Sequence, residues 1–258
     1  MDVALVPRQG ESSAQSQRRF VRLRPLVSVI VPTLNEAENL PGVFERLPRD
    51  LHEVIVVDGG SNDATVATAR GLRPQVRVLR QLGSGKGDAL ALGFAAASGD
   101  IVVTVDADGS TDPRDIPRFV ATLGAGADVV KGSRFLDGGG SDDLTRLRRI
   151  GARALTALVN LLFGTEYTDV CFGYTAFWRR SLGQIATAPG FEVEASMCIS
   201  AARAGLDVVE LASFERKRVH GESKLHAVRD GLRILVTILG ARVQRRADQE
   251  PVEAPASA

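Results

Sequence analysis

Short runs of apolar, often β-branched residues alternate with helical patterns along the chain from Leu26 onward. Continuous apolar runs of this kind are typical of parallel strands, which are covered on both faces of a sheet. The pattern predicts strands at 27–31, 53–58, 76–79, 101–105 and 128–131, and helices near 36–46, 63–71, 88–97 and 113–123. We therefore expect βαβ units in an α/β fold, with the polar loops that follow the strands gathered at the edge where such sheets bind ligands.

The regular alternation ends after Lys131, where a loop rich in Gly, Ser and Asp is followed by longer helices. Helices are predicted at 146–163, 194–204 and 226–243, with short strands at 208–211 and 214–219. No apolar stretch approaches the roughly 20 residues that a membrane span needs. The organisation predicted is a flexible basic leader at 1–24, a single domain at 25–245 and a disordered tail at 246–258.

The last predicted helix combines an apolar stripe with positive charge. Its apolar residues recur at helical spacing with arginines between them: Leu225, Val228, Leu232, Leu235 and Leu239. Such a stripe either covers the core of the protein itself or lies on an anionic lipid surface. The sequence leaves both interpretations open.

Composition narrows the class of protein. The chain has 258 residues, of which 44% are hydrophobic and 24% charged, as in an ordinary folded domain. A formal net charge of +1 argues against a basic surface for nucleic acid, so no nucleic-acid partner is expected. Cys171 and Cys198 lie far apart, which predicts two reduced thiols and a cytoplasmic protein, rather than disulfides or a cysteine zinc site.

Two carboxylates directly follow the predicted strand 101–105, in Asp106-Ala-Asp108. Mg²⁺ or Mn²⁺ is commonly held by one or two carboxylates and completed by phosphate oxygens and water. This pair would therefore suit a divalent cation that neutralises a diphosphate. A turn that caps the next helix is the alternative interpretation.

Other polar loops also follow strands. Asp58 ends one strand and precedes Gly59, where backbone can approach a flat ligand, while Asn35 and Glu36 follow another; helix caps are the alternative in both places. The segment Gly83-Ser-Gly-Lys-Gly-Asp88 has neither the spacing of a P-loop nor that of a dinucleotide fingerprint. It predicts a glycine-rich helix start that brings Lys86 to a phosphate, or else a flexible loop.

These segments, in this order, resemble the family 2 inverting glycosyltransferases of the GT-A fold. The resemblance rests on Val29-Ile-Val-Pro-Thr-Leu-Asn-Glu36, Val57-Asp-Gly-Gly-Ser-Asn-Asp63, Gly85-Lys-Gly-Asp-Ala89 and Asp106-Ala-Asp-Gly109, and it extends from about Pro25 to Val243. Gly132-Ser-Arg-Phe135, Asp169-Val-Cys-Phe-Gly-Tyr174 and Arg218-Val-His-Gly-Glu-Ser-Lys-Leu225 look most like the dolichol-phosphate or polyprenyl-phosphate mannose and glucose synthases. The resemblance implies an α/β GT-A fold, with a mostly parallel sheet flanked by helices. It also implies a donor half at 25–131 and an acceptor half at 132–245.

The resemblance also implies roles for individual residues. Catalysis would involve Asp108, Arg218 and Glu194, and the metal would bind to Asp106 and Asp108. The donor nucleotide would contact Pro32, Asn35, Glu36, Asp58, Gly59, Lys86 and Asp106. The acceptor phosphate would contact Arg134, Arg148, Arg149, Ser223 and Lys224. Two positions depart from the lipid-phosphate synthases, because Ser110 replaces a metal-binding Gln and Ala152 replaces a serine that supports the acceptor phosphate.

The function implied is transfer of a hexose, with inversion, from a nucleotide-diphosphate sugar such as GDP-mannose or UDP-glucose to a polyprenyl or dolichyl phosphate. Mg²⁺ or Mn²⁺ would assist, and the protein would be cytoplasmic, with peripheral attachment to the inner face of the cell membrane as an option. One alternative is transfer to a hydroxyl of a polysaccharide or small-molecule precursor, which needs a general base such as Glu192 or Glu194. The others are a sugar nucleotidyltransferase, although 32–36 lacks its glycine-rich loop, and a non-catalytic nucleotide-binding module.

Overall fold

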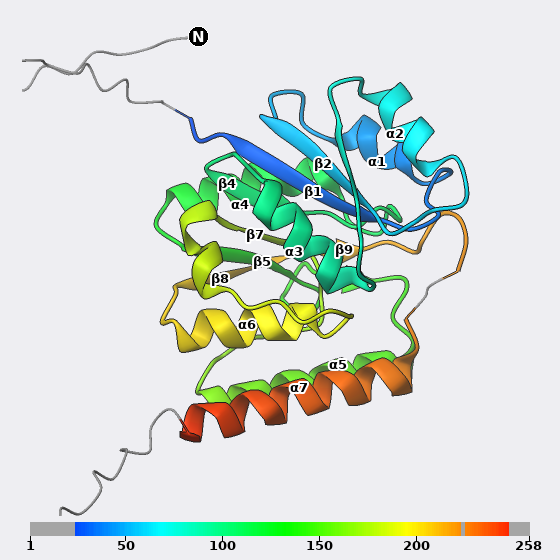
Figure 1. Ribbon diagram of the computed structural model, residues 1–258. Helices are drawn as coiled ribbons and strands as arrows, with labels where there is room; N and C mark the ends of the chain where they lie inside the picture. The colour runs from blue at the N-terminus through cyan, green and yellow to red at the C-terminus, as the bar shows by residue number, and fades with distance from the viewer. Residues whose placement is uncertain (1–23, 223–224, 248–258) are drawn as a thin grey trace, which may run out of the picture.

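A seven-stranded sheet forms the centre of the molecule in the computed structural model, which describes residues 24–222 and 225–247 (Figure 1). The strand order is β3-β2-β1-β4-β7-β5-β8, and every neighbouring pair is parallel except those of β7, which runs antiparallel to β4 and β5. The strands are β1 (Val27–Thr33), β2 (Glu53–Asp58), β3 (Arg77–Arg80), β4 (Ile101–Thr104), β5 (Val129–Ser133), β7 (Thr175–Trp178) and β8 (Val208–Ala212). The predicted mostly parallel sheet is confirmed.

Helices cover both faces of this sheet. On one face, α1 (Leu40–Arg46), α2 (Thr65–Leu72) and α4 (Ile116–Gly124) bury apolar side chains against the strands. On the other face, α3 (Lys86–Ala96) and α6 (Val193–Arg203) do the same. Because both faces are covered, the β1 and β4 strands are buried almost throughout, as their continuous apolar sequences predict.

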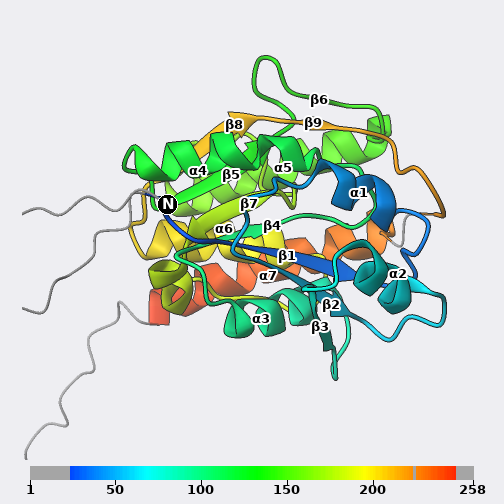
Figure 2. The ribbon, with the colours of Figure 1, turned by 90° about the horizontal axis from the view of Figure 1, so that it is seen from above.

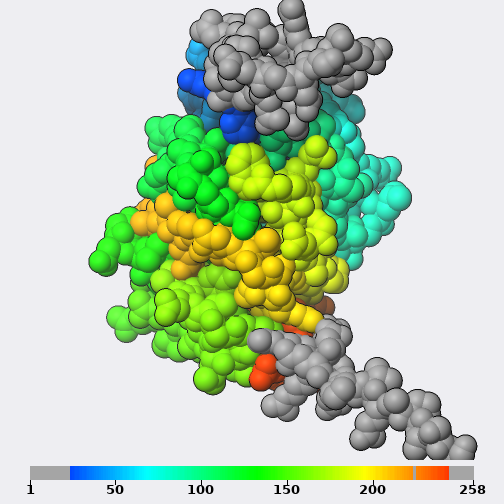
Figure 3. Space-filling view, turned by 90° about the vertical axis from the view of Figure 1, so that its left-hand side faces the viewer, coloured from blue at the N-terminus to red at the C-terminus, as the bar shows by residue number. Residues whose placement is uncertain are grey.

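A further layer lies outside α6. It consists of α5 (Arg146–Phe163) and α7 (Ala227–Ala247), which lie side by side and pack against α6 through Val159, Cys198 and Ile238 (Figure 1). Viewed from the side, the blue and cyan N-terminal part and the red end of α7 lie at opposite ends of the molecule (Figure 3). The outward faces of α5 and α7 therefore lie away from the sheet.

The second half departs most from the sequence pattern. The pattern did not predict β7, a four-residue strand in which Ala176 and Phe177 are fully buried. Its burial on both faces arises only because it is inserted between β4 and β5. The predicted strand at 214–219 shortens to β9 (Phe214–Glu215), which pairs with β6 (Gly140–Ser141).

Several predictions fall on parts of the chain that are not described. The leader at 1–24 lies outside the described residues except for Arg24, and so does the tail at 246–258 except for its first two residues. Ser223 and Lys224, expected at the acceptor phosphate, also lie outside them. Among the helices that the structure describes, none is both long and apolar enough to cross a bilayer.

Candidate active site

A pocket of about 280 Å³ lies at the carboxyl ends of β1, β2 and β4. It is called here the donor pocket, because residues predicted to contact the donor nucleotide line it. The order of strands reverses at β1, which has β2 on one side and β4 on the other, and α/β sheets bind ligands at such a point (Figure 2). The pocket brings together residues predicted from separate motifs: Pro32, Glu36, Gly59, Lys86, Asp106, Asp108 and Arg218.

The two carboxylates after β4 fit a divalent cation. Asp106 and Asp108 are about a quarter exposed, and both line the pocket. Asp108 accepts a hydrogen bond from the backbone N–H of Ser110 through Oδ1, whereas its Oδ2 lies 3.7 Å from Arg218 and accepts no hydrogen bond from the described residues. Within the described part of the chain, no group of three or more His, Cys, Asp and Glu residues is placed to hold a metal. The remaining ligands would have to be substrate oxygens and water, as is usual for Mg²⁺.

Lys86 joins the carboxylate of Asp106 to a second, buried one, that of Glu194. Its Nζ lies 2.6 Å from Asp106 Oδ1 and 2.8 Å from Glu194 Oε1. Burial alone would lower the pKa of Lys86, but the two carboxylates raise it above its ordinary value, so the ammonium group stays charged. Burial raises the pKa of Glu194 although Lys86 opposes this. Lys86 thus fixes Asp106 and Glu194 relative to each other.

We expect Gly173→Ala to disturb this ion triad, because a Cβ at position 173 would lie 2.5 Å from Lys86 Nζ and 2.9 Å from Glu194 Oε1. The displaced ammonium group would leave Asp106 misplaced, and turnover should fall at least about tenfold, since small misplacements in a preorganised site are costly. Steady-state kinetics would measure the effect. Gly183→Ala is the matched control, since its Cβ would meet nothing within 4 Å. Equal turnover in the two variants would contradict a role for the triad.

Arg218 closes the donor pocket from the second half of the chain. Its guanidinium makes two hydrogen bonds to Glu36, of 2.8 and 2.9 Å, which raise its pKa although burial lowers it. Its Nε is buried and has no hydrogen-bond partner in the described structure. A buried donor of this kind is costly unless a ligand satisfies it, and a phosphate oxygen would do so.

Two predicted nucleoside contacts, Asp58 and Asn35, are not among the residues that line this pocket, although each is adjacent in sequence to one that is. Asp58 accepts hydrogen bonds from the N–H groups of Gly60 and Ser61 through Oδ2, while its buried Oδ1 has no partner within the described residues. That oxygen could accept a hydrogen bond from a base or ribose. Asn35 has a positive φ of 58° and accepts from the N–H of Asn62 through Oδ1, so its side chain ties two loops together.

The start of α3 is closed to phosphate. The N–H groups of Gly87 and Asp88 both donate to the carbonyl oxygen of Pro189, at 2.9 and 3.2 Å. Gly87 is required there because a Cβ would lie 1.6 Å from the carbonyl oxygen of Ala188. The glycine-rich segment therefore serves close packing at these positions, and Ser84, Gly85 and Lys86 are the part of it that lines the pocket.

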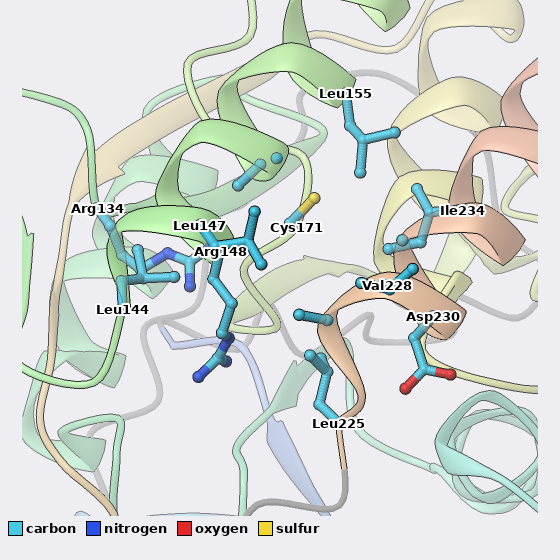
Figure 4. Close-up of a pocket in the computed structure, with 14 residues that line it drawn as sticks. Arg134, Leu144, Leu147, Arg148, Leu155, Cys171, Leu225, Val228, Asp230 and Ile234 are labelled. Atoms are coloured by element: carbon cyan, nitrogen blue, oxygen red, sulfur yellow. The ribbon is translucent and has the colours of Figure 1, made fainter.

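The donor pocket continues into a second region, lined mostly by residues of the predicted acceptor half of the chain. A junction of about 120 Å³, which also contains Asp108 and Arg218, leads to an apolar pocket of about 220 Å³ between α5 and α7. Arg148 and Cys171 line both the junction and the apolar pocket. Figure 4 shows apolar side chains around this pocket, with Arg134 and Arg148 opposite the α7 residues. The site is therefore a polar donor pocket joined to an apolar one.

The three predicted acceptor arginines that the structure describes differ in their surroundings. Arg134 is buried and donates to Asp169 at 2.7 and 3.0 Å and to Glu215 at 3.2 and 3.3 Å. Arg148 pairs with Asp143 at 2.8 Å and is partly exposed. Arg149 does not line the pockets described above. Of the three, Arg148 is the best placed for an acceptor phosphate.

Sequence reasoning missed other lining residues. Phe191 lines both the donor pocket and the junction, and Gln81 lines the donor pocket while donating to the carbonyl oxygen of Gly85 at 2.8 Å. Neither residue belongs to the strand-end loops singled out in the sequence. The position of Gln81 directly after β3 was the one available signal, because β3 ends at the same edge of the sheet. Two residues differ from those expected in the lipid-phosphate synthases. Of these, Ser110 lines the junction and Ala152 lines the apolar pocket.

Comparisons with known proteins agree with this geometry. The model of glycosyl transferase family 2 matches residues 28–186. The polyprenol monophosphomannose synthase of Mycolicibacterium smegmatis is 31% identical over 234 residues, which cover 85% of this chain and 88% of that protein. The undecaprenyl-phosphate mannosyltransferase of Micrococcus luteus is 33% identical over 212 residues, which cover 77% and 87%.

A solved structure shares the fold. Glucosyl-3-phosphoglycerate synthase from Mycobacterium tuberculosis, crystallised with Mn²⁺, UDP and glucosyl-3-phosphoglycerate, superposes with a TM-score of 0.68 and 28% sequence identity. The match covers 85% of this chain and 80% of that one. It confirms the GT-A architecture expected from the sequence.

Proposed function

Because the chain belongs to glycosyl transferase family 2 and is a glycosyltransferase, we propose that it transfers a hexose from a nucleotide-diphosphate sugar to a polyprenyl phosphate. The observation that carries this proposal is the apolar pocket of about 220 Å³ that continues from the donor pocket and has Arg148 in its wall. A prenyl chain is apolar and its phosphate is anionic. The chain would therefore pack against the leucines that line the pocket, and the phosphate would bind Arg148.

The residues of the donor pocket would hold the nucleotide sugar. Asp58 would accept a hydrogen bond from the nucleoside, and Arg218 would donate to the diphosphate through its unpaired Nε. Asp106 and Asp108 would hold Mg²⁺ or Mn²⁺, which when bound supplies positive charge to the leaving diphosphate. The related synthase was crystallised with Mn²⁺ and UDP, which supports the use of a divalent cation.

The reaction would be a single displacement with inversion. An oxygen of the acceptor phosphate attacks the anomeric carbon, a new C–O bond forms, and the bond to the diphosphate oxygen breaks, so that the nucleotide diphosphate departs with the electron pair. The acceptor phosphate is already ionised near neutral pH and needs no strong general base. Glu194 would then position Lys86 and Asp106, and it would serve as a base only if the acceptor were a hydroxyl.

The test is to incubate the protein with labelled GDP-mannose or UDP-glucose, Mn²⁺ and a polyprenyl phosphate, and to count label in the organic phase. We expect label in the organic phase with at least one donor. Arg148→Met should raise the KM for the lipid phosphate at least about tenfold, since a charge-assisted contact to phosphate is lost. Parallel reactions with 3-phosphoglycerate and with a sugar hydroxyl acceptor would identify the alternative. No organic-phase label with any donor would refute the lipid acceptor.

A further inference from the structure

An aromatic side chain lies where the donor pocket meets the junction. Among the residues that the structure describes, five line both spaces, and four of these are charged: Lys86, Asp106, Asp108 and Arg218. The fifth is Phe191, which is partly exposed. A diphosphate and a divalent cation account for the charged groups but not for an apolar ring at the same place. Phe191 is therefore suited to a different part of the ligand.

The strand order shows which part of the donor this is. At one end of the donor pocket, Gly59 and Gln81 directly follow β2 and β3. In the opposite direction, the junction extends to Arg134, which directly follows β5. Phe191 lies at the boundary, between the end that would hold the nucleoside and the end that leads to the acceptor. In a nucleotide sugar, the hexose occupies this intermediate position.

The backbone around Phe191 is held by the glycine-rich start of α3. The N–H groups of Gly87 and Asp88 both donate to the carbonyl oxygen of Pro189, two residues before Phe191. A backbone hydrogen bond of 3.4 Å closes the turn 190–193, with Phe191 inside it. The close packing that leaves the start of α3 closed to phosphate therefore serves a purpose, because it fixes the turn that carries the ring.

A second aromatic residue lines the junction, but its ring is already in use. Phe172 is 3% exposed, and the guanidinium carbon of Arg134 lies 5.0 Å from the centre of its ring. Phe191 is the more exposed of the two and lines the donor pocket as well. Of the two rings, that of Phe191 is therefore the one accessible to a donor.

We propose that Phe191 is the platform on which the donor hexose packs, and that its ring keeps water from the anomeric carbon. A pyranose ring presents C–H groups on its faces, and the face of an aromatic ring carries partial negative charge that attracts them. This inference rests on the proposed function for the class of donor, a nucleotide-diphosphate sugar. It does not depend on the identity of the acceptor.

Opening the platform should allow hydrolysis of the donor. The oxygen of a water molecule then attacks the anomeric carbon, and the bond to the diphosphate oxygen breaks. The nucleoside diphosphate departs with the electron pair, the water gives up a proton to the solvent, and free hexose is released. At saturating donor and without acceptor, Phe191→Ala should therefore form free hexose at least about fivefold faster than the original chain.

Calorimetric titration in the presence of Mn²⁺ tests the contact with the sugar. Phe191→Leu keeps an apolar side chain but removes the ring, so its affinity for UDP and GDP should stay within about twofold of the original. Its affinity for UDP-glucose or GDP-mannose should fall about three- to tenfold, and Phe191→Tyr, which keeps the ring, should restore it. Phe214→Leu is the matched control, since it removes an exposed ring of β9 that lines none of these spaces.

Two results would overturn the platform. One is equal weakening of nucleoside diphosphate and nucleotide sugar in Phe191→Leu, because the ring would then contact the nucleotide or only support the fold. The other is unchanged affinity for the nucleotide sugar, in which case organic-phase label would leave the proposed function standing without the platform. If affinity for the sugar is lost selectively but no lipid phosphate is labelled, the proposed acceptor fails while the platform stands. If the original chain binds neither nucleotide sugar, both proposals fail.

Discussion

Asp108→Asn should lower kcat/KM for sugar transfer by about 10²- to 10³-fold and abolish the stabilisation by Mn²⁺ together with nucleoside diphosphate. Asp108 lies in the loop after β4 and lines the pocket, and its Oδ2 lies 3.7 Å from Arg218. Asparagine keeps the size and the contact to the N–H of Ser110 but removes the charge that a divalent cation needs. The effect should therefore be on chemistry and metal binding, with little change in folding.

Two measurements would check this expectation. Turnover of the nucleotide sugar gives the loss of activity, and thermal shift with and without Mn²⁺ gives metal binding, because specific binding stabilises the native state. Asp137→Asn is the matched control, since Asp137 is exposed in the loop before β6. Full metal-dependent activity in Asp108→Asn would refute the metal assignment and would favour a donor site that works by Arg218 and Lys86 alone.

The donor side could be predicted from sequence because its determinants are local. The strands β1, β2 and β4 are continuous apolar runs, each followed within three residues by a residue that lines the pocket, such as Glu36, Gly59 and Asp106. Parallel pairing then brings these strand ends together without further information. The same short-range reasoning found the stripe on α7.

The contacts that decide individual roles are not local. Arg218 binds Glu36 across 182 positions of the sequence. Arg134 binds Asp169 and Glu215, and the three residues come from three separate segments of the chain. An isolated arginine carries no pattern that tells a phosphate contact from an internal ion pair. The antiparallel strand β7, which the sequence pattern did not predict, begins two residues after Gly173 and so helps to place Gly173 beside Lys86.

Arg134→Met should destabilise the fold by about 3–5 kcal/mol, because removing one partner of a buried ion cluster leaves charges without compensation. Burial would raise the pKa of Asp169, but the hydrogen bonds from Arg134 hold it below its ordinary value. A carboxyl group of this kind stabilises the native state at neutral pH, and its contribution declines as pH falls below about 4, towards the lowered pKa of the native state. The difference in stability between original and variant should therefore narrow in acid.

Arg148→Met is the matched comparison, since Arg148 is partly exposed and pairs with Asp143 alone among the carboxylates of the described residues. Its loss should change the free energy of unfolding by less than about 1 kcal/mol while raising the KM for the lipid phosphate. Urea unfolding and steady-state kinetics on both variants separate the two roles. If Arg134→Met were as stable as the original chain and impaired only in acceptor binding, Arg134 would be the phosphate ligand after all, and its pairing with Asp169 and Glu215 would have to open when the acceptor binds.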